Sequence, residues 1–289
     1  MDPVHLILSR KGFDGTAGGG ASPILADGRM LSLPIPEPIA PEDGPTFGSL
    51  HDVDGTDYLA LLGWLGYDAY DERSVAHLDP DLVPTIRPRK PGWRGMLGQV
   101  DAAASHLVNQ GVGPGDLFLF WGLFAHNGPT GRFRGQRTRH AVYGYLEVGE
   151  VVDAGAGETV ATALYHPHFS PGFRGRQNRV YVATDRLSRD RSRPGWGVFR
   201  WSPSLTLTAP HSSGLTTWQL PECFHPSTGT TLTYHGRSER WSEPDGSGHV
   251  TVERRGRGQE FVCVATEPIL EWVLDLITTA PLWAPDRPG

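Results

Sequence analysis

Short apolar runs separated by turn-forming residues predict a chain built mainly from strands. Val4–Ser9 is expected to form a first strand. Leu117–Phe124 (LFLFWGLF) is apolar on both alternating faces, which is typical of a central strand covered on both sides. Further strands are expected at Met30–Pro36, at Ala141–Val152, at Val180–Ala183 and at several short stretches between Gly197 and Val264.

Two segments carry the 3.6-residue periodicity of a helix. Residues 96–110 predict an interior helix that ends at Gly111, and Ile269–Ile277 predicts a C-terminal helix with Thr266 as N-cap and Pro268 in its first turn. The apolar face of the first helix is expected to comprise Leu97, Val100, Ala104, Leu107 and Val108. The pattern as a whole predicts an α+β, mainly β, fold with a mixed or barrel-like sheet core, one interior helix and a C-terminal helix.

The chain shows no internal repeat and no linker that would divide it. We therefore expect residues 1–289 to form a single domain. Residues 37–92 are rich in aspartate and proline and predict a long acidic excursion of irregular structure, with one short helix near Tyr58–Trp64. Long ordered loops often carry function, so this excursion is a place to search for chemistry.

Composition and charge exclude several classes of protein. With 38% hydrophobic and 20% charged residues, the chain reads as folded and soluble. A formal charge of −6 excludes a polycation that binds any nucleic acid. The charge is divided, however: residues 37–82 carry eleven acids and one base, whereas residues 132–200 carry twelve bases and six acids. Only two cysteines and the lack of a long apolar stretch favour a reducing cytoplasm and no membrane.

The first candidate for chemistry follows the first predicted strand. Lys11 is one of only two lysines, the other being Lys90, and it opens the glycine-rich loop Lys11–Gly20 with Asp14 three residues on. A lysine and an acid at this spacing can meet at a strand end and supply an amine nucleophile with a carboxylate that moves protons. The alternative is a surface ion pair beside a flexible loop.

The acidic excursion contains two clusters of histidine and acid, His51-Asp52-Val53-Asp54 and His77-Leu78-Asp79-Pro80-Asp81. Residues two apart in an extended segment face the same side. His77 and Asp79 can therefore hold a metal or act as a base with its orienting acid. The alternative is turn formation, because Asp-Pro is a common turn former.

His166-Pro167-His168 is a third candidate, since the proline keeps the backbone extended and points both imidazoles the same way. Two histidines with a distant carboxylate would form a facial metal site, although no third ligand is identified. The alternative is packing beside Phe169 and Phe173. We assume no cofactor from the sequence.

A basic belt gives the fourth candidate. Its phosphate-binding candidates are Arg132, Arg134, Arg137, Arg174, Arg176 and Arg179, to which we add Arg10 beside Lys11. Guanidinium groups bind phosphates and the interleaved phenylalanines can stack bases, which suits a nucleotide or single-stranded nucleic acid. The alternative is a solvated charged face.

Several of these motifs lie in strings that resemble the third type of nucleotide modification associated domain. The strings are ILSRKGFD (7–14), SPILADGR (22–29), SLPIP (32–36), HLDPD (77–81), GQ (98–99), GDLFLF (115–120), HPH (166–168), NRVYVA (178–183), WQLPECFHP (218–226) and GQEF (258–261). The resemblance covers nearly the whole chain. It implies a setting in phage and bacterial systems, including phage–host conflict, that make or handle modified DNA bases. Locally, VYGYLEV (142–148) is also similar to PUA-like and ASCH-like nucleic-acid-binding barrels.

Three functions are compatible with these residues. The first is an enzyme acting on a modified or modifiable nucleobase in DNA or a nucleotide, for instance by N-glycosidic cleavage or base transfer. Its catalytic residues would be Lys11, Asp14, His77 and Asp79. The second is a PUA/ASCH-like reader of modified bases without chemistry. The third is a metal-dependent hydrolase or oxygenase that uses His166 and His168 with an acid from the 37–82 stretch. DNA or a nucleotide is the expected partner, with other base-modification enzymes or a second copy of the chain as further candidates.

Overall fold

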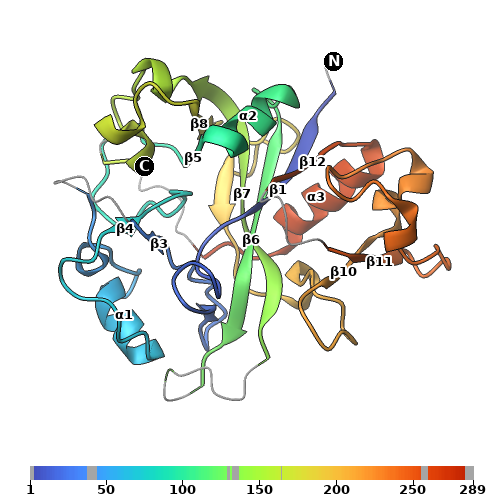
Figure 1. Ribbon diagram of the computed structural model, residues 1–289, viewed down its shortest axis with the longest axis horizontal. Helices are drawn as coiled ribbons and strands as arrows, with labels where there is room; N and C mark the ends of the chain where they lie inside the picture. The colour runs from blue at the N-terminus through green and yellow to red at the C-terminus, as the bar shows by residue number, and fades with distance from the viewer. Residues whose placement is uncertain are drawn as a thin grey trace.

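A mixed sheet forms the centre of the molecule (Figure 1). The computed structural model describes residues 3–37, 44–128, 131, 137–163, 165–254 and 260–283. The strand order is β12-β1-β6-β7-β8-β5, with β2 added to β6 and β9 added to β7. β1 runs parallel to β6 and antiparallel to β12. The predicted α+β, mainly β, class with a mixed sheet is confirmed.

The strands of this sheet are β1 (His5–Arg10), β2 (Ser22–Ile24), β5 (Met96–Val100), β6 (Leu117–His126), β7 (Arg139–Val152), β8 (Asn178–Ala183), β9 (Trp196–Val198) and β12 (Glu260–Val264). Two small sheets pair β3 (Ile35–Pro36) with β4 (Ala76–His77) and β10 (Thr217–Pro221) with β11 (His249–Glu253). The helices are α1 (Tyr58–Leu65), α2 (Asp101–Asn109) and α3 (Glu267–Thr279).

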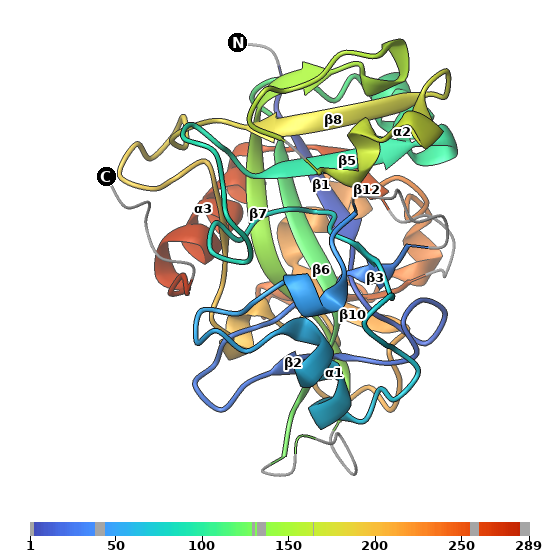
Figure 2. The same ribbon diagram turned by 90° about the vertical axis from the view of Figure 1, so that its left-hand side faces the viewer.

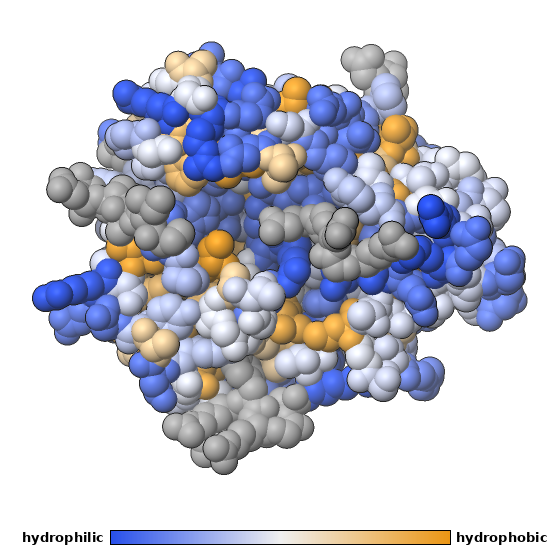
Figure 3. Space-filling model, viewed as in Figure 1, coloured by the Kyte–Doolittle hydropathy of each residue, from blue (hydrophilic) through white to orange (hydrophobic). Residues whose placement is uncertain are grey.

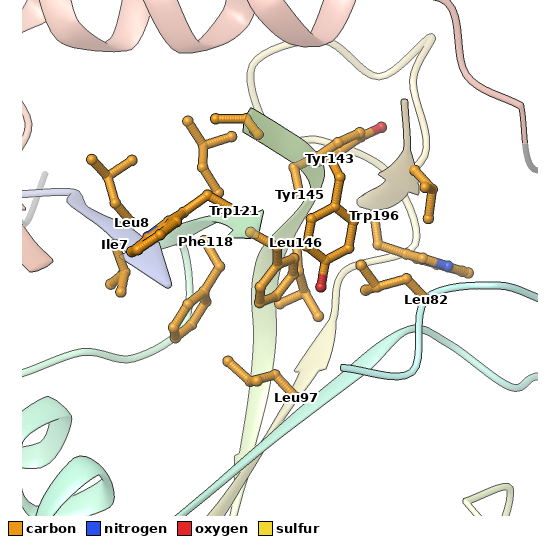
Figure 4. Close-up of a cluster of buried hydrophobic side chains, with 14 of the residues drawn as sticks. Ile7, Leu8, Leu82, Leu97, Phe118, Trp121, Tyr143, Tyr145, Leu146 and Trp196 are labelled. Atoms are coloured by element: carbon orange, nitrogen blue, oxygen red, sulfur yellow. The ribbon is translucent and has the colours of Figure 1, made fainter. Parts of the chain in front are cut away.

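The central strands are apolar because they are covered on both faces. Phe118, Leu119 and Phe120 of β6 are fully buried, as are Leu6 to Leu8 of β1. Figure 4 shows side chains from β1, β6 and β7 meeting in one apolar cluster with Leu97 of β5. Burial on both faces is what the continuous apolar run predicted.

The sheet bends along the long β6–β7 hairpin. The register of β6 and β7 shifts between Phe120 and Trp121, and that of β7 and β8 shifts between Val148 and Glu150. Irregularities of this kind increase local twist. Figure 2 shows the result: β8 and β5 run across the upper ends of β6 and β7.

Helices α1 and α3 lie on opposite sides of the sheet in both ribbon views (Figures 1 and 2). α3 begins after Thr266, as predicted, and buries the stripe Ile269, Leu270, Val273, Leu276 and Ile277. α1 confirms the short helix expected in the acidic excursion, and Asp57 caps it by accepting a hydrogen bond from the Ala60 amide at 2.7 Å. Among the described helices, none combines the length and apolarity needed to cross a bilayer.

The helix predicted over residues 96–110 is wrong for residues 96–100 and right for most of the remainder. Met96–Val100 forms β5, which pairs with β8, and the helix begins only at Asp101, whose φ of +53° turns the chain. In α2 only Ala104 and Leu107 are buried, and Val108, which was expected on the apolar face, is 43% exposed. The cause is non-local pairing, which overrides helical periodicity in so short a segment.

The strand expected at Met30–Pro36 is also shorter than predicted. Only Ile35–Pro36 forms β3, whereas Met30 makes an isolated bridge to Ile24. The hydrophobic side chains of this segment are nevertheless buried, with Leu31 and Leu33 fully enclosed. Their burial comes from loop packing against the sheet, which a linear pattern does not distinguish from strand formation.

Candidate functional site

A buried polar cluster lies where the end of β1, the start of β12 and β5 meet. Antiparallel pairing of β1 with β12 sets Ser9 directly opposite Glu260. Lys11 follows β1 immediately, and its amide donates to the Trp121 carbonyl at 2.9 Å, which extends the β1–β6 pairing to this residue. Asp79 reaches the same place from the acidic excursion.

Lys11 lies between two buried carboxylates. Its Nζ is 3.5 Å from Asp79 Oδ2 and 3.8 Å from Glu260 Oε1. The side chains of Lys11, Asp79 and Glu260 are 10%, 3% and 2% exposed, so the lysine is the most accessible of the three. The Gly98 amide donates to Asp79 Oδ1 at 2.6 Å, and Gln99 Nε2 donates to Glu260 Oε1. Two adjacent residues of β5, Gly98 and Gln99, therefore orient the carboxylates of Asp79 and Glu260.

The surroundings move the pKa values of the two carboxyls in opposite directions. Burial acts to raise the pKa of Asp79, but Lys11 and the two histidines outweigh it and hold this pKa well below its usual range. Burial raises the pKa of Glu260, and the charge of Asp79 adds to the rise, while Lys11 and the Gln99 hydrogen bond only partly oppose it. Asp79 is thus an anion at neutral pH, and Glu260 is the carboxyl of the two that takes up a proton more readily.

Three imidazoles surround Asp79. His166 Nε2 is 3.5 Å from Asp79 Oδ1, and His168 Nε2 is 4.0 Å from Asp79 Oδ2. The His77 ring stands edge-on to that of His168, with centroids 5.3 Å apart. Burial lowers the pKa of His168 to about 4, although the charge of Asp79 opposes this, so the ring is neutral at pH 7. We call Lys11, Asp79, Glu260, His166 and His168 the Lys11 cluster.

The expected packing of the histidine pair beside phenylalanines is also present. His168 stacks on Phe173 with an interplanar angle of 11°, and the His166 ring lies 5.7 Å from that of Phe169. His168 also fills the space over Gly98, where a Cβ would lie 2.1 Å from its Cδ2 atom. The two interpretations of His166-Pro167-His168, packing and chemistry, are therefore compatible.

Two tyrosine hydroxyls complete the polar interior. Tyr143 of β7 and Tyr181 of β8 are both buried. Burial raises the pKa of each, and the charge of Glu260 raises both further. A cavity of about 30 Å³ lies beside Asp79, with Ser32 and Tyr143 in its lining, and it has room for one water molecule.

Asp14 does not lie with Lys11 as the spacing predicted. It pairs with Arg10, and its Oδ1 accepts hydrogen bonds from the amides of Thr16 and Ala17 at 2.6 and 2.9 Å. The lysine and Asp14 are separated because successive strand residues point to opposite faces, which sends Arg10 and Lys11 to different sides. Asp14 closes the turn of the glycine-rich loop.

The other histidine–acid cluster also forms a turn. Asp52 Oδ1 accepts from the amides of Asp54 and Thr56 at 2.9 and 3.0 Å, and both aspartates pair with Arg29. This geometry matches the structural alternative given for the cluster.

Arginines of the basic belt are engaged by different parts of the chain. Arg137 donates to the carbonyls of Pro210 and Ser212, Arg176 pairs with Asp101, and Arg179 pairs with Asp153. Arg174 is exposed, whereas Arg132 and Arg134 lie outside the described residues. The face drawn in Figure 3 is mostly hydrophilic, with hydrophobic residues confined to small areas.

The model of nucleotide modification associated domain 3 matches residues 5–264. The chain belongs to this family. No curated protein and no solved structure matches it. The Lys11 cluster lies within the region matched to nucleotide modification associated domain 3, and membership associates the chain with nucleotide modification.

Sequence reasoning missed Glu260, Gln99 and Tyr143 as site residues. Gln99 and Glu260 stand in strings that carried the family resemblance, and Tyr143 stands in the string that is similar to PUA-like and ASCH-like barrels. Their partners are distant in sequence, as Gln99 and Glu260 are 161 residues apart. Such residues meet only when the strands of the sheet have assembled, so their proximity is not visible in the sequence.

Proposed function

We propose that the chain is an enzyme acting on a modified or modifiable nucleobase, in DNA or in a nucleotide, with Lys11 as the reacting amine. The observation that carries this proposal is a buried lysine between two carboxyls whose pKa values move apart. Such pairs supply an acid and a base at one pH. Strongly perturbed carboxyls concentrate at functional sites.

The roles follow from these properties. Asp79, which stays ionised, stabilises positive charge that develops on the sugar as a base departs. Glu260, which can carry a proton, exchanges it with the departing base or with the amine. In N-glycosidic cleavage, the Lys11 ammonium passes one proton through Glu260 to the departing base, and the amine so formed bonds to the sugar C1′ while the electron pair of the C1′–N bond leaves with the protonated base. The bound nitrogen then gives a second proton to the ring oxygen as the C1′–O bond breaks, and opening of the sugar ring leaves a Schiff base.

The substrate must approach from the lysine side of the cluster. The cavity beside Asp79 has room for only one water molecule, so a nucleobase does not fit there. Lys11 is the most exposed of the three charged side chains. A base removed from the DNA helix would present its sugar to this amine.

Borohydride trapping tests the proposal. Incubation with DNA carrying modified bases, followed by borohydride, is expected to give a covalent protein–DNA adduct. The chain offers a matched control, because Lys90 is its only other lysine and is exposed. Lys11→Ala should abolish the adduct and Lys90→Ala should retain it.

Two results would contradict this function. An adduct that persists in Lys11→Ala, with the variant folded as judged by circular dichroism, would exclude Lys11 as the reacting amine. Affinity for modified DNA without adduct or base release in the wild-type protein would favour the reader of modified bases instead. Parallel assays with free nucleotides identify the form of the substrate.

A further inference from the structure

We propose that His77, Asp79 and His168 bind a divalent first-row transition metal ion. One ligand atom from each of these residues lies within 4.8 Å of the other two. Two imidazoles and one carboxylate are the ligands of facial sites that leave further positions open for water or substrate. The site shares Asp79 with the amine chemistry proposed for Lys11, but it can be tested without substrate.

Both histidines are oriented as metal-binding histidines are. His77 Nδ1 is 2.5 Å from Glu37 Oε2, and His168 Nδ1 is 2.8 Å from Asn178 Oδ1. An oxygen acceptor at Nδ1 fixes the proton there and leaves Nε2 with a lone pair. The Asn178 amide is itself held, because its Nδ2 donates to the His168 carbonyl at 2.7 Å.

The Asp79 carboxylate is also fixed in place by its neighbours. Asp79 Oδ1 accepts the Gly98 amide at 2.6 Å, while Oδ2 is the oxygen that faces His168. The His168 ring is fixed between Gly98 and Phe173. The ligands come from two segments, residues 77–79 and residue 168, and they are preorganised by packing and by additional hydrogen bonds, which lowers the cost of binding an ion.

The spacing requires only a small adjustment. Metal–ligand bonds of about 2.1 Å allow at most roughly 4.2 Å between two ligand atoms. The three ligand atoms lie within 4.8 Å of one another, so side-chain movements of less than about 1 Å bring them into range, and His77, which is 15% exposed, is the least enclosed of the three.

His166 gives an independent indication. This imidazole is only 5% exposed, and its Nδ1 has no hydrogen-bond partner among the described residues. A buried ring nitrogen without a partner is costly unless something binds it. Its Nε2 lies 3.5 Å from Asp79 Oδ1, which places it beside the same ion as a further ligand or as a partner of bound water.

The donor set selects the class of metal. Imidazole nitrogen favours Zn²⁺, Fe²⁺, Co²⁺ or Ni²⁺ over Mg²⁺ and Ca²⁺, which prefer oxygen ligands. A divalent ion on Asp79 Oδ2 would compete with Lys11, whose Nζ is 3.5 Å from that oxygen. Ion binding should therefore weaken the Lys11–Asp79 pair and leave Glu260 as the lysine's partner.

Direct metal binding tests the site. Protein purified without an affinity tag and stripped with chelator is titrated with Co²⁺ and Zn²⁺, by calorimetry and by the visible absorption of Co²⁺. We expect one equivalent of either ion to bind. His77→Gln and His168→Gln should each weaken binding at least 100-fold. Glu37→Ala, which removes the acceptor that orients His77, should weaken it by about 10–100-fold.

His225→Gln is the matched control, because His225 is a buried histidine, 4% exposed, whose Nδ1 pairs with Ser227 outside the site. It should bind the ion as the wild type does. His77→Gln changes the least buried ligand and serves if His168→Gln does not fold. Wild-type protein that binds no Co²⁺ or Zn²⁺, or folded His77→Gln with unchanged affinity, would overturn the proposal. Neither result depends on the Lys11 adduct.

Discussion

Replacing Lys11 with methionine is expected to destabilise the fold, because it leaves Asp79 buried without its cation. Coulomb's law with an effective dielectric constant of about 20 gives about 5 kcal/mol for unit charges at the observed 3.5 Å. Removal of one partner from buried ion pairs costs about 3–5 kcal/mol, which agrees. An unfolding entropy of about 2.1 cal/mol/K per residue, over 289 residues, converts this loss to a Tm lower by about 5–8 °C.

The loss should depend on pH in a defined direction. The pKa of Asp79 is lowered in the folded protein, so its stabilising contribution is complete above the unfolded pKa of about 4 and is lost as the pH falls below it. The difference between wild type and Lys11→Met should therefore be full at pH 7 and smaller below pH 4. Thermal unfolding followed by circular dichroism at both pH values measures it.

A double variant decides whether the charge pair is responsible. Adding Asp79→Asn to Lys11→Met removes the uncompensated charge and should recover part of the lost stability. Lys90→Met, at an exposed lysine, should change the free energy of unfolding by less than about 0.5 kcal/mol. The reasoning fails if Lys11→Met lowers the Tm by less than about 2 °C at pH 7, or if Asp79→Asn adds a further independent loss.

Three further outcomes are expected. Gly98→Ala should destabilise the protein by about 1–3 kcal/mol in thermal unfolding, because the added Cβ would lie 2.1 Å from the His168 ring. Gly172→Ala is the control, since its Cβ meets nothing within 4 Å and the change should be neutral. Equal stability of the two variants would contradict this. Burial, with two nearby arginines, lowers the pKa of His140 to about 3. The free energy of unfolding should therefore fall as the pH drops from about 6.5 towards 3, by at most about 1.4 kcal/mol per pH unit from this histidine. In His140→Leu, unfolding should take up one proton fewer in this pH range, so the free energy should fall less steeply with pH. An unchanged pH dependence would refute the assignment. Burial raises the pKa of Cys263 to about 12, so iodoacetamide at pH 8 should modify the partly exposed Cys223 first. Mass spectrometry of peptides measures the order of labelling. Labelling of Cys263 before Cys223 would contradict its burial.

The parts of the fold that the sequence predicted are those in which local pattern and tertiary structure agree. β6 is apolar throughout because it is central, and α3 has a buried stripe at helical spacing. The segment Met96–Val100 was assigned wrongly because its pairing with β8 is decided by residues about eighty positions away. Helical periodicity over five residues cannot outweigh a ladder of strand hydrogen bonds that the sequence does not display.

The site was predicted by residue type rather than by arrangement. Lys11, His77, Asp79 and the pair at 166 and 168 were named for their chemistry, and the structure brings them together. The carboxyl expected to partner the lysine was Asp14, whereas the structure supplies Asp79 and Glu260. Spacing alone suggested that Lys11 and Asp14 meet. The alternation of side chains along a strand and the β1–β12 register instead decide which acid faces the Lys11 amine.

The place of β1 between β6 and β12 also governs when the site can exist during synthesis. Glu260 and the strand that carries it are synthesised more than two hundred residues after Lys11. Until then, one edge of β1 lacks its neighbour and Lys11 lacks one of its two carboxylates. A nascent or prematurely terminated chain that lacks β12 therefore contains the lysine but not the assembled site, and any reactivity of that amine towards nucleic acid appears only after β12 has been made.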